Sequence, residues 1–117
     1  MILYGVFLEN KLVGFFTFIK NGPLADAHFL GYDVSLNSKY QIYFNMLLKL
    51  LESAIEQKAS HLNLSRTALE IKSSVGAEPF DMSVYLRHEN SLINKFGKFI
   101  LDRTVPKNEW QQRSPFK

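Results

Sequence analysis

The stretch from Tyr40 to Lys58 constrains the fold more than any other part of the chain. Its polar residues recur every three or four positions and form one narrow stripe, while nearly all other positions are apolar. The stripe consists of Gln41, Asn45, Lys49, Glu52 or Ser53, and Glu56. This spacing predicts a helix over residues 40–58 whose wide apolar face packs on a β-sheet rather than on a single partner helix.

Three apolar runs precede this helix and predict strands of the sheet. Ile2–Leu8 and Leu12–Ile19 are rich in Val, Ile, Phe and Tyr, and the short polar break that contains Asn10 predicts a β-hairpin between them. Neither run alternates cleanly, so we expect both strands to be covered on both faces. A third strand is predicted at about Ala27–Val34, followed by a loop at 35–38 that carries several candidate helix caps.

The second half of the chain predicts alternating short strands and helices. His61–Leu64 is expected to be a strand parallel to the third one, because the helix between them is long enough for a βαβ crossover. The remaining expected elements are a helix at Thr67–Val75 that Gly76 ends, a strand at Pro79–His88 and a helix at Asn90–Leu101. The predicted order is β-β-β-α-β-α-β-α, a mixed three-layer α/β sandwich over residues 1–103 with an extended basic arm at 104–117.

Composition excludes several classes of function. The 117 residues suffice for one domain, and the absence of cysteine excludes disulfides, Cys-ligated metals and thiol nucleophiles. The three histidines share no ligand spacing, so no metal site is expected. A net charge of +3 is too small for a dedicated nucleic-acid binder. Neither a signal peptide nor a membrane span is visible, so we expect a soluble, cytoplasmic protein.

A resemblance to a known family lies in the segment Leu62–Ala77. It reads LNLSRTALEIKSSVGA and resembles the LNxGRT-xxEIKSxxGA word of bacterial GNAT-like proteins, which are often grouped with the FemAB-type peptidyltransferases. The words KLVGFF and HFLGYD also recur in such proteins, so the resemblance covers roughly residues 2–103. It implies a GNAT-like fold that is partial, because a full domain carries one more strand and two helices ahead of the hairpin. The missing strand would leave a sheet edge open, and a second copy of the chain could cover it to form a homodimer.

The resemblance implies an acyl or aminoacyl transferase. The donor would be acetyl-CoA, another acyl-CoA or an aminoacyl-tRNA, and the acceptor an amine on a small molecule or a cell-wall precursor. The sequence departs from the family at Ser65, where the word has glycine, and at the glycine-free loop 35–41, where acetyltransferases bind pyrophosphate through backbone N–H groups. The glycine-free loop and the missing first strand and helices favour an alternative: a non-catalytic GNAT-like half-domain that serves dimerisation or supports a catalytic half elsewhere.

Three residues are candidates for catalysis. By its position in the resemblance, Lys72 would lie near the transferred acyl group and stabilise developing negative charge. Arg66, expected at the mouth of a helix, could bind an anionic group, and His28 could serve as a general base. The alternatives are an Arg66–Glu70 ion pair that only tethers the turn, with Lys72 exposed to solvent, and a structural role for His28.

Asp33, Glu70 and Tyr40 are the candidates for substrate binding. Asp33 could orient an amine, although capping of the turn at 35–38 is favoured. Tyr40 belongs to an aromatic set with Tyr43 and Phe44 that could stack on a cofactor, but the spacing of the set is that of the buried face of a helix. Four basic residues from position 103 to the end, Arg103, Lys107, Arg113 and Lys117, with Trp110 and Phe116 between them, could follow a tRNA backbone, or the two aromatic side chains could pin the tail across the domain or across a dimer mate.

Overall fold

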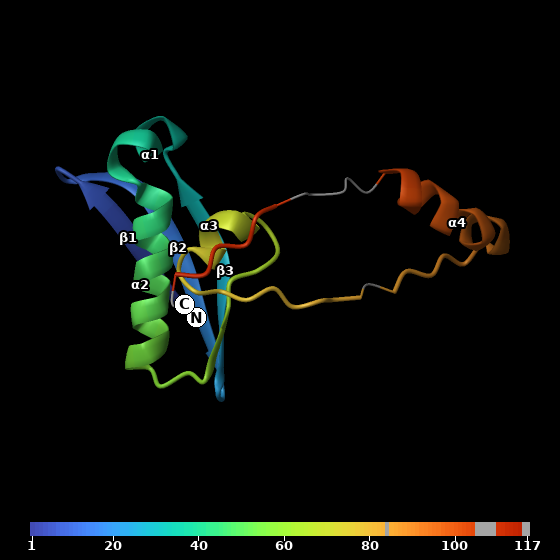
Figure 1. The fold of residues 1–117 in the computed structure, drawn as a ribbon, viewed down its shortest axis with the longest axis horizontal. Coiled ribbons are helices and arrows are strands. Elements are labelled where there is room, and N and C mark those ends of the chain that lie inside the picture. Colours follow the sequence, from blue (N-terminus) through green and yellow to red (C-terminus); the bar gives the residue numbers. More distant parts are fainter. Residues whose placement is uncertain (84, 105–109, 116–117) are drawn as a thin grey trace. The chain divides into compact units, whose positions relative to one another are not determined.

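The computed structural model describes residues 1–83, 85–104 and 110–115 and divides into two compact units (Figure 1). The sheet unit comprises Met1–Ala77 together with Gln112–Lys117, and the helical unit comprises Glu78–Gln111. The chain is of the mixed α/β class, as the sequence predicted. Its described elements follow the order β-β-β-α-α-β-α-α, which differs from the expected order by one added helix and one missing strand.

The sheet unit is built on a four-stranded mixed sheet with the strand order β1-β2-β3-β4. Its strands are β1 (Ile2–Leu8), β2 (Lys11–Asn21), β3 (Leu24–Tyr32) and β4 (His61–Asn63). The first three pair antiparallel, while β4 pairs parallel to β3. The predicted hairpin and the predicted parallel crossover are therefore confirmed, and β3 begins before the expected Ala27.

Two tight turns join the antiparallel strands. Glu9 and Asn10 have φ angles of 47° and 66°, the left-handed pair of a two-residue type I′ turn, whose twist matches that of the flanking strands. Gly22, with φ 58°, takes the left-handed position of the second turn, which a residue with a Cβ would adopt only at a cost.

The predicted long helix is confirmed as α2 (Ile42–Glu56), but the loop expected at 35–38 is wrong. These residues lie in α1 (Val34–Tyr40), because Asp33 caps a helix there: its Oδ1 accepts hydrogen bonds from Ser35 N at 3.0 Å and Ser35 Oγ at 2.6 Å. Gln41, with φ 49°, separates the two helices.

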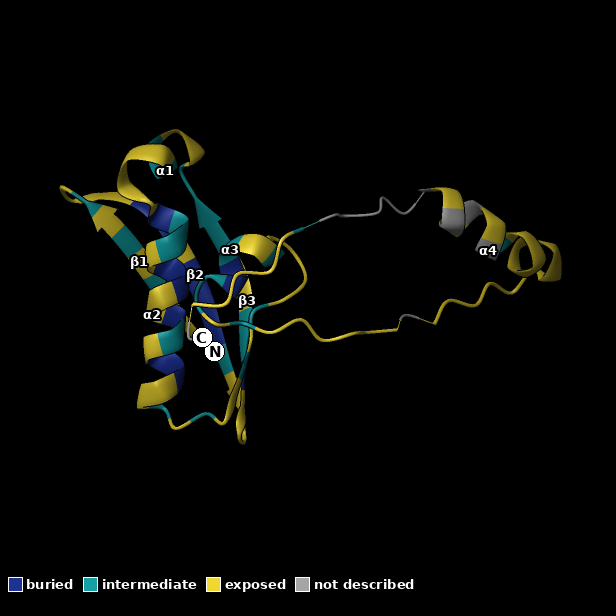
Figure 2. Ribbon diagram, in the orientation of Figure 1, coloured by how far each residue is buried: buried dark blue, intermediate teal, exposed yellow. Residues whose placement is uncertain are grey.

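The core lies between α2 and one face of the sheet, which we call the inner face (Figure 2). Phe16 and Phe18 of β2 and Met46, Leu47 and Leu50 of α2 are each at most 1% exposed. Tyr4 on β1 extends the core by stacking on Phe16, with ring centroids 4.8 Å apart. The apolar face of α2 therefore packs on a sheet, as its pattern predicts.

The opposite, outer face of the sheet exposes large apolar side chains, and the expectation that both faces are covered is wrong for the described part of this unit. Five such side chains are 41–65% exposed: Leu3, Phe7, Leu12, Phe15 and Phe29. The sheet unit therefore has two layers instead of the expected three.

After β4 the chain forms α3 (Leu69–Ser73), which is shorter than the helix expected at Thr67–Val75. Ala68, the residue before its first turn, has φ 55°, so the helix cannot begin at Thr67. Gly76 follows with φ 85°, in keeping with its predicted role in ending the helix.

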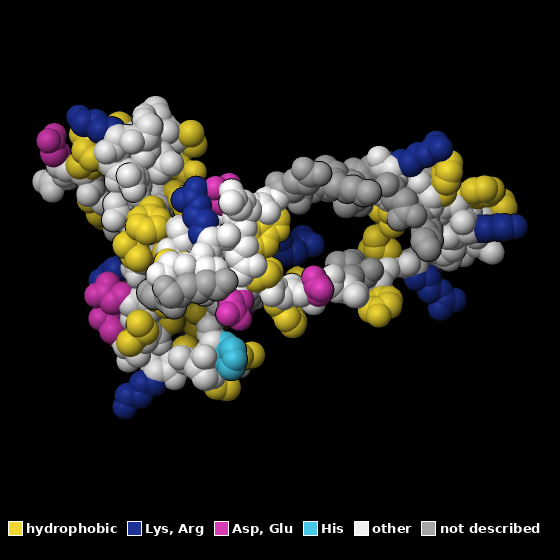
Figure 3. Space-filling view, in the orientation of Figure 1, with side chains coloured by type: hydrophobic (Ala, Val, Ile, Leu, Met, Phe, Trp, Pro, Cys, Tyr) yellow, Lys and Arg dark blue, Asp and Glu magenta, His cyan; other side chains and the backbone are white. Residues whose placement is uncertain are grey.

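The helical unit contains α4 (Ser91–Thr104), which confirms the helix predicted at Asn90–Leu101. The strand predicted at Pro79–His88 is wrong for residues 79–83 and 85–88, which have no regular structure; Val84 lies outside the described residues. Hydrophobic side chains stand exposed on α4 (Figure 3), among them Leu92, Ile93, Phe96 and Phe99.

Residues 105–109 and 116–117 of the expected basic arm also lie outside the described residues, and the arm and its boundary stay a prediction. None of the described helices is long and apolar enough to cross a lipid bilayer.

Candidate ligand pocket beyond the ends of β3 and β4

The parallel strands β3 and β4 separate soon after they meet. Only three residue pairs join them, from Leu24↔His61 to Asp26↔Asn63, whereas β3 continues to Tyr32. In open α/β sheets, ligands bind in the crevice outside the carboxyl ends of such strands. The segments that follow β3 and β4 are therefore the place to look for a site.

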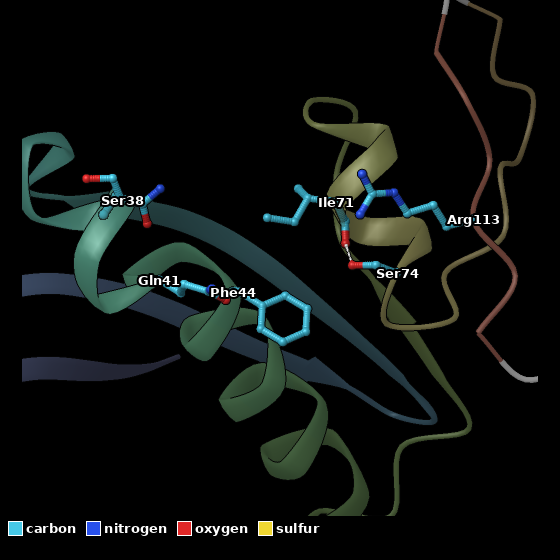
Figure 4. A pocket seen from close by; sticks show the side chains of 7 residues that line it. Ser38, Gln41, Phe44, Ile71, Ser74 and Arg113 are labelled. Carbon is cyan, nitrogen blue, oxygen red and sulfur yellow. Dashed lines mark hydrogen bonds between the residues drawn. The ribbon is translucent and has the colours of Figure 1, made fainter.

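A pocket of about 410 Å³ lies between those segments (Figure 4). One side is formed by the end of α1 and the start of α2, and the other by α3 and the C-terminal segment 112–115. Its lining residues are Asn37, Ser38, Gln41, Phe44, Ile71, Ser74 and Arg113. The volume is in the range of small-molecule sites.

The junction of α1 and α2 shapes the first side of the pocket. Gln41 donates its backbone N–H to Asn37 O at 2.8 Å and makes no capping bond with its side chain. The cap comes from Asn37 instead, whose Oδ1 accepts from Tyr43 N at 2.9 Å. The left-handed Gln41 thus turns the chain tightly without glycine and places the N-terminus of α2, with its partial positive charge, at the pocket.

The second side brings the C-terminal segment onto α3. Arg113 donates its backbone N–H to Ser73 Oγ at 2.8 Å, and its guanidinium forms an ion pair with Glu70 Oε1 at 2.6 Å. Glu70 therefore pairs with Arg113, and the Arg66–Glu70 pair considered as an alternative is wrong. Both side chains of the observed pair are at least half exposed, so it contributes little to stability.

The lining combines polar groups at the rim with two apolar side chains. Phe44 and Ile71 approach the pocket from α2 and α3, while Ser38, Gln41 and Arg113 supply a hydroxyl, an amide and a cation (Figure 4). Such a set suits a ligand that carries an anionic group beside an apolar part.

Lys72 of α3 is a buried cation, and its neighbour in the sequence, Ile71, lines the pocket. The residue is only 5% exposed, so the alternative that leaves Lys72 exposed to solvent is wrong. The hydrogen bond of its Nζ is a long one, 3.5 Å to Ser65 O. Neither of the ion pairs of the described residues includes it. Burial lowers the pKa of the Lys72 ammonium, because desolvation penalises the charged form.

The other two catalytic candidates differ in their position relative to Lys72: Arg66 follows Ser65, whose carbonyl accepts the Lys72 hydrogen bond, whereas His28 lies on the other face of the sheet. Arg66 is exposed in the turn between β4 and α3. His28 is exposed on β3, where the edge of its ring meets Phe29 on the outer face, with centroids 4.1 Å apart. Ile71 and Val75, which flank Lys72, instead pack against the core on the inner face. The structure therefore does not gather the three predicted catalytic residues into one site.

The remaining candidates have local partners. Asp33 caps α1 as described, and the Ser35 hydroxyl that donates to it holds the pKa of its carboxyl below the usual range. Tyr40, at the end of α1, is 37% exposed with the Lys39 ammonium 4.9 Å from its ring centroid, so the expectation that Tyr40 is a core residue is wrong. Tyr43 packs beside Tyr32, and burial raises the pKa of its hydroxyl.

Sequence reasoning found only part of the pocket. Asn37, Ser38 and Gln41 belong to the loop that the resemblance assigns to the donor, but Arg113 was placed in an arm, and Ile71, Ser74 and Phe44 were not singled out as pocket residues. The βαβ crossover was the available signal, since it predicts a crevice beyond the two parallel strands.

The described residues contain no group of three or more His, Asp or Glu side chains that could hold a metal ion. Comparisons with protein-family models, with curated proteins and with solved structures find no match to this chain.

Proposed function

We propose that the chain is a GNAT-like acyltransferase domain that binds an acyl-CoA in the pocket beyond β3 and β4 and transfers the acyl group to an amine. The observation that carries this proposal is the position of the pocket, at the N-terminus of the crossover helix α2 and between the segments that follow the parallel strands β3 and β4. A helix N-terminus favours a phosphate group, and Arg113 offers a second positive charge.

The backbone at Ser65 supports the resemblance on which the proposal draws. Ser65 has φ 64°, a left-handed conformation that glycine adopts most readily, and the family word has glycine at this position. Ser65 N donates to Asn63 Oδ1 at 2.9 Å, which helps a serine to hold the same turn. The left-handed backbone at Ser65 is thus one that the glycine of the family word would adopt without strain, which supports the resemblance.

In the proposed reaction, the acceptor nitrogen attacks the thioester carbonyl carbon, the C–S bond breaks, and the CoA sulfur leaves with the electron pair. A proton passes from the nitrogen to solvent or to the leaving thiolate. Lys72 supplies a positive charge that stabilises the thioester carbonyl oxygen as this oxygen becomes negative. For this role the Lys72 side chain turns from Ser65 toward Ser74 and the pocket. An aminoacyl-tRNA donor would react in the same way with an oxygen leaving group, and its binding would weaken steeply with salt.

Thermal unfolding of the chain in the presence of acetyl-CoA, with CoA as a second titrant, tests the proposal. A ligand that binds only the native state at a hundredfold excess over its Kd adds about 2.7 kcal/mol, which raises Tm by roughly ten degrees in a domain of this size. Arg113→Gln should weaken the saturable shift, whereas Arg66→Gln, at an exposed arginine outside the pocket lining, should leave it unchanged. The absence of any shift at millimolar acetyl-CoA would contradict the proposal.

A second candidate is the non-catalytic half-domain. The separation of His28 from Lys72 favours it, because a catalytic set is normally gathered around the reacting atoms. It predicts that the chain releases no CoA from acetyl-CoA in the presence of amines, even where acetyl-CoA binds. Detection of free thiol formed by the chain but not by Lys72→Met would exclude it.

A further inference from the structure

We propose that the outer face of the sheet is the interface through which two copies of this chain form a dimer. This interface is independent of the proposed function, since it lies on the face of the sheet opposite the core and includes none of the pocket residues.

The amount of exposed apolar surface fits such an interface. Leu3, Phe7, Leu12, Phe15 and Phe29 are 65%, 64%, 55%, 41% and 62% exposed. Together they present on the order of 500 Å² of apolar surface, since a large aromatic side chain has about 200 Å² to bury. A stable interface buries about 800 Å² per partner, so this patch can form its apolar centre with a polar rim around it.

Two glycines make the patch flat. A Cβ at Gly31 would lie 2.7 Å from Phe15 Cε1, and a Cβ at Gly5 would lie 2.8 Å from Phe7 Cε2. The Phe15 ring therefore lies over Gly31 of the neighbouring strand β3, and the Phe7 ring lies over Gly5 of its own strand, rather than standing away from the sheet. A flat apolar sheet face matches a second flat sheet face, as in two-sheet sandwiches.

The apolar character of the five side chains suits a second copy of the same face. In a two-fold dimer each residue meets its own counterpart or a neighbour, so a charged patch would repel itself, whereas an uncharged apolar patch is self-complementary. Nucleic acids and anionic lipid surfaces would require basic residues among these side chains.

The sequence predicted a different dimer, through an open edge of the sheet. β1 is indeed an edge strand, so this second arrangement is available. The two differ in what they bury: the edge dimer pairs the backbone of β1, whereas the face dimer covers Phe15 at the centre of the outer face. A substitution at Phe15 therefore distinguishes them.

Sedimentation equilibrium of the full chain tests the interface. We expect a reversible dimer, and Phe15→Lys should raise its dissociation constant at least about tenfold, because it buries a charge at the centre of the interface. Leu48→Lys is the matched control, since Leu48 is similarly exposed, at 43%, but lies on α2. Phe29→Lys with its control Ile55→Lys, at residues 62% and 67% exposed, replaces this pair if circular dichroism shows that Phe15→Lys does not fold.

Cross-linking gives a second readout, because the chain has no cysteine of its own. Phe15→Cys should form a disulfide-linked dimer under mild oxidation, and Leu48→Cys at the same concentration should form little. A monomeric wild-type chain, a dimer that Phe15→Lys leaves intact, or equal cross-linking of the two cysteine variants would each overturn the proposal.

Discussion

Ser65 adopts a backbone conformation that its side chain disfavours. Its φ of 64° is left-handed, where a Cβ costs about 1–2 kcal/mol and glycine has no such cost. We expect Ser65→Gly to raise the free energy of unfolding, by up to about 1 kcal/mol because glycine also loses more entropy on folding. Urea denaturation measures the change. Ser65→Ala is the control, since it keeps the Cβ and should bring no gain.

Lys72 is a second residue that its surroundings disfavour, because its charged side chain is buried. Lys72 is only 5% exposed and has no carboxylate partner among the described residues, which lowers stability, so Lys72→Met should raise the free energy of unfolding at pH 7 by about 1 kcal/mol. At Lys11, which is exposed, the same substitution should change little. Lower stability of Lys72→Met would mean that the ammonium has a stabilising partner.

The difference in the free energy of unfolding between Lys72→Met and the wild-type chain should depend on pH, because the pKa of Lys72 is lowered. Between the lowered value and the ordinary 10.5, the unfolded chain binds a proton that the native state lacks, so the Lys72 contribution to stability rises with pH across that window. The advantage of Lys72→Met should therefore be greatest below the native pKa and shrink as the pH approaches 10.5. Comparing the two proteins by urea denaturation cancels the titration of groups that they share.

At the scale of elements, Gly14 sets how closely α2 approaches the sheet. A Cβ there would lie 3.2 Å from Gly31 O and 3.3 Å from Met46 Sδ, and the carbonyl is held in the sheet. We expect Gly14→Ala to cost about 1 kcal/mol, because the strand or the helix must move to accommodate it. Gly5→Ala should cost less, since the ring that it meets belongs to the exposed Phe7 and can turn away.

Periodicity was a reliable guide to elements whose partners lie nearby in the sequence. The polar stripe predicts α2 because one helix face meets one sheet face, and the two apolar runs predict β1 and β2 because a tight turn joins them. The strand at Pro79–His88 was wrong because a strand requires a hydrogen-bonding partner, which an alternating sequence cannot supply by itself. Helix α1 was missed because a few capping residues look the same in a loop and at a helix start.

The pocket could be predicted only on the side that adjoins the crossover. The junction at Gln41 follows directly from β3 and precedes α2, so its position beyond the strand ends is readable from the order of elements. Arg113 contacts α3, forty residues earlier in the sequence, through one hydrogen bond from its backbone N–H to Ser73 and one ion pair with Glu70. No local sequence pattern predicts such a contact. The burial of Lys72 could not be predicted from the sequence either, because α3 is too short to show which of its faces is apolar.

At the scale of the whole molecule, the two units differ in how well their backbone is protected from proteases. In the sheet unit, lysines such as Lys20 and Lys49 lie in a paired strand or a packed helix, whereas residues 85–90 of the helical unit are exposed and carry no regular structure. Proteases cut exposed, irregular backbone first, because the segment must fit the enzyme in an extended form. Trypsin should therefore cleave after Arg87 well before it cleaves after Lys20 or Lys49.

Mass spectrometry of a digestion time course measures this order of cleavage. Arg87→Gln should abolish the cut after Arg87, while Arg66→Gln should leave that cut unchanged. Slow cleavage at Arg87, comparable to that at Lys49, would show that residues 85–90 are protected in solution, as a paired strand at Pro79–His88 would be. The same experiment thus decides whether the alternating pattern of that segment finds a partner strand, and it does so without reference to the activity of the pocket.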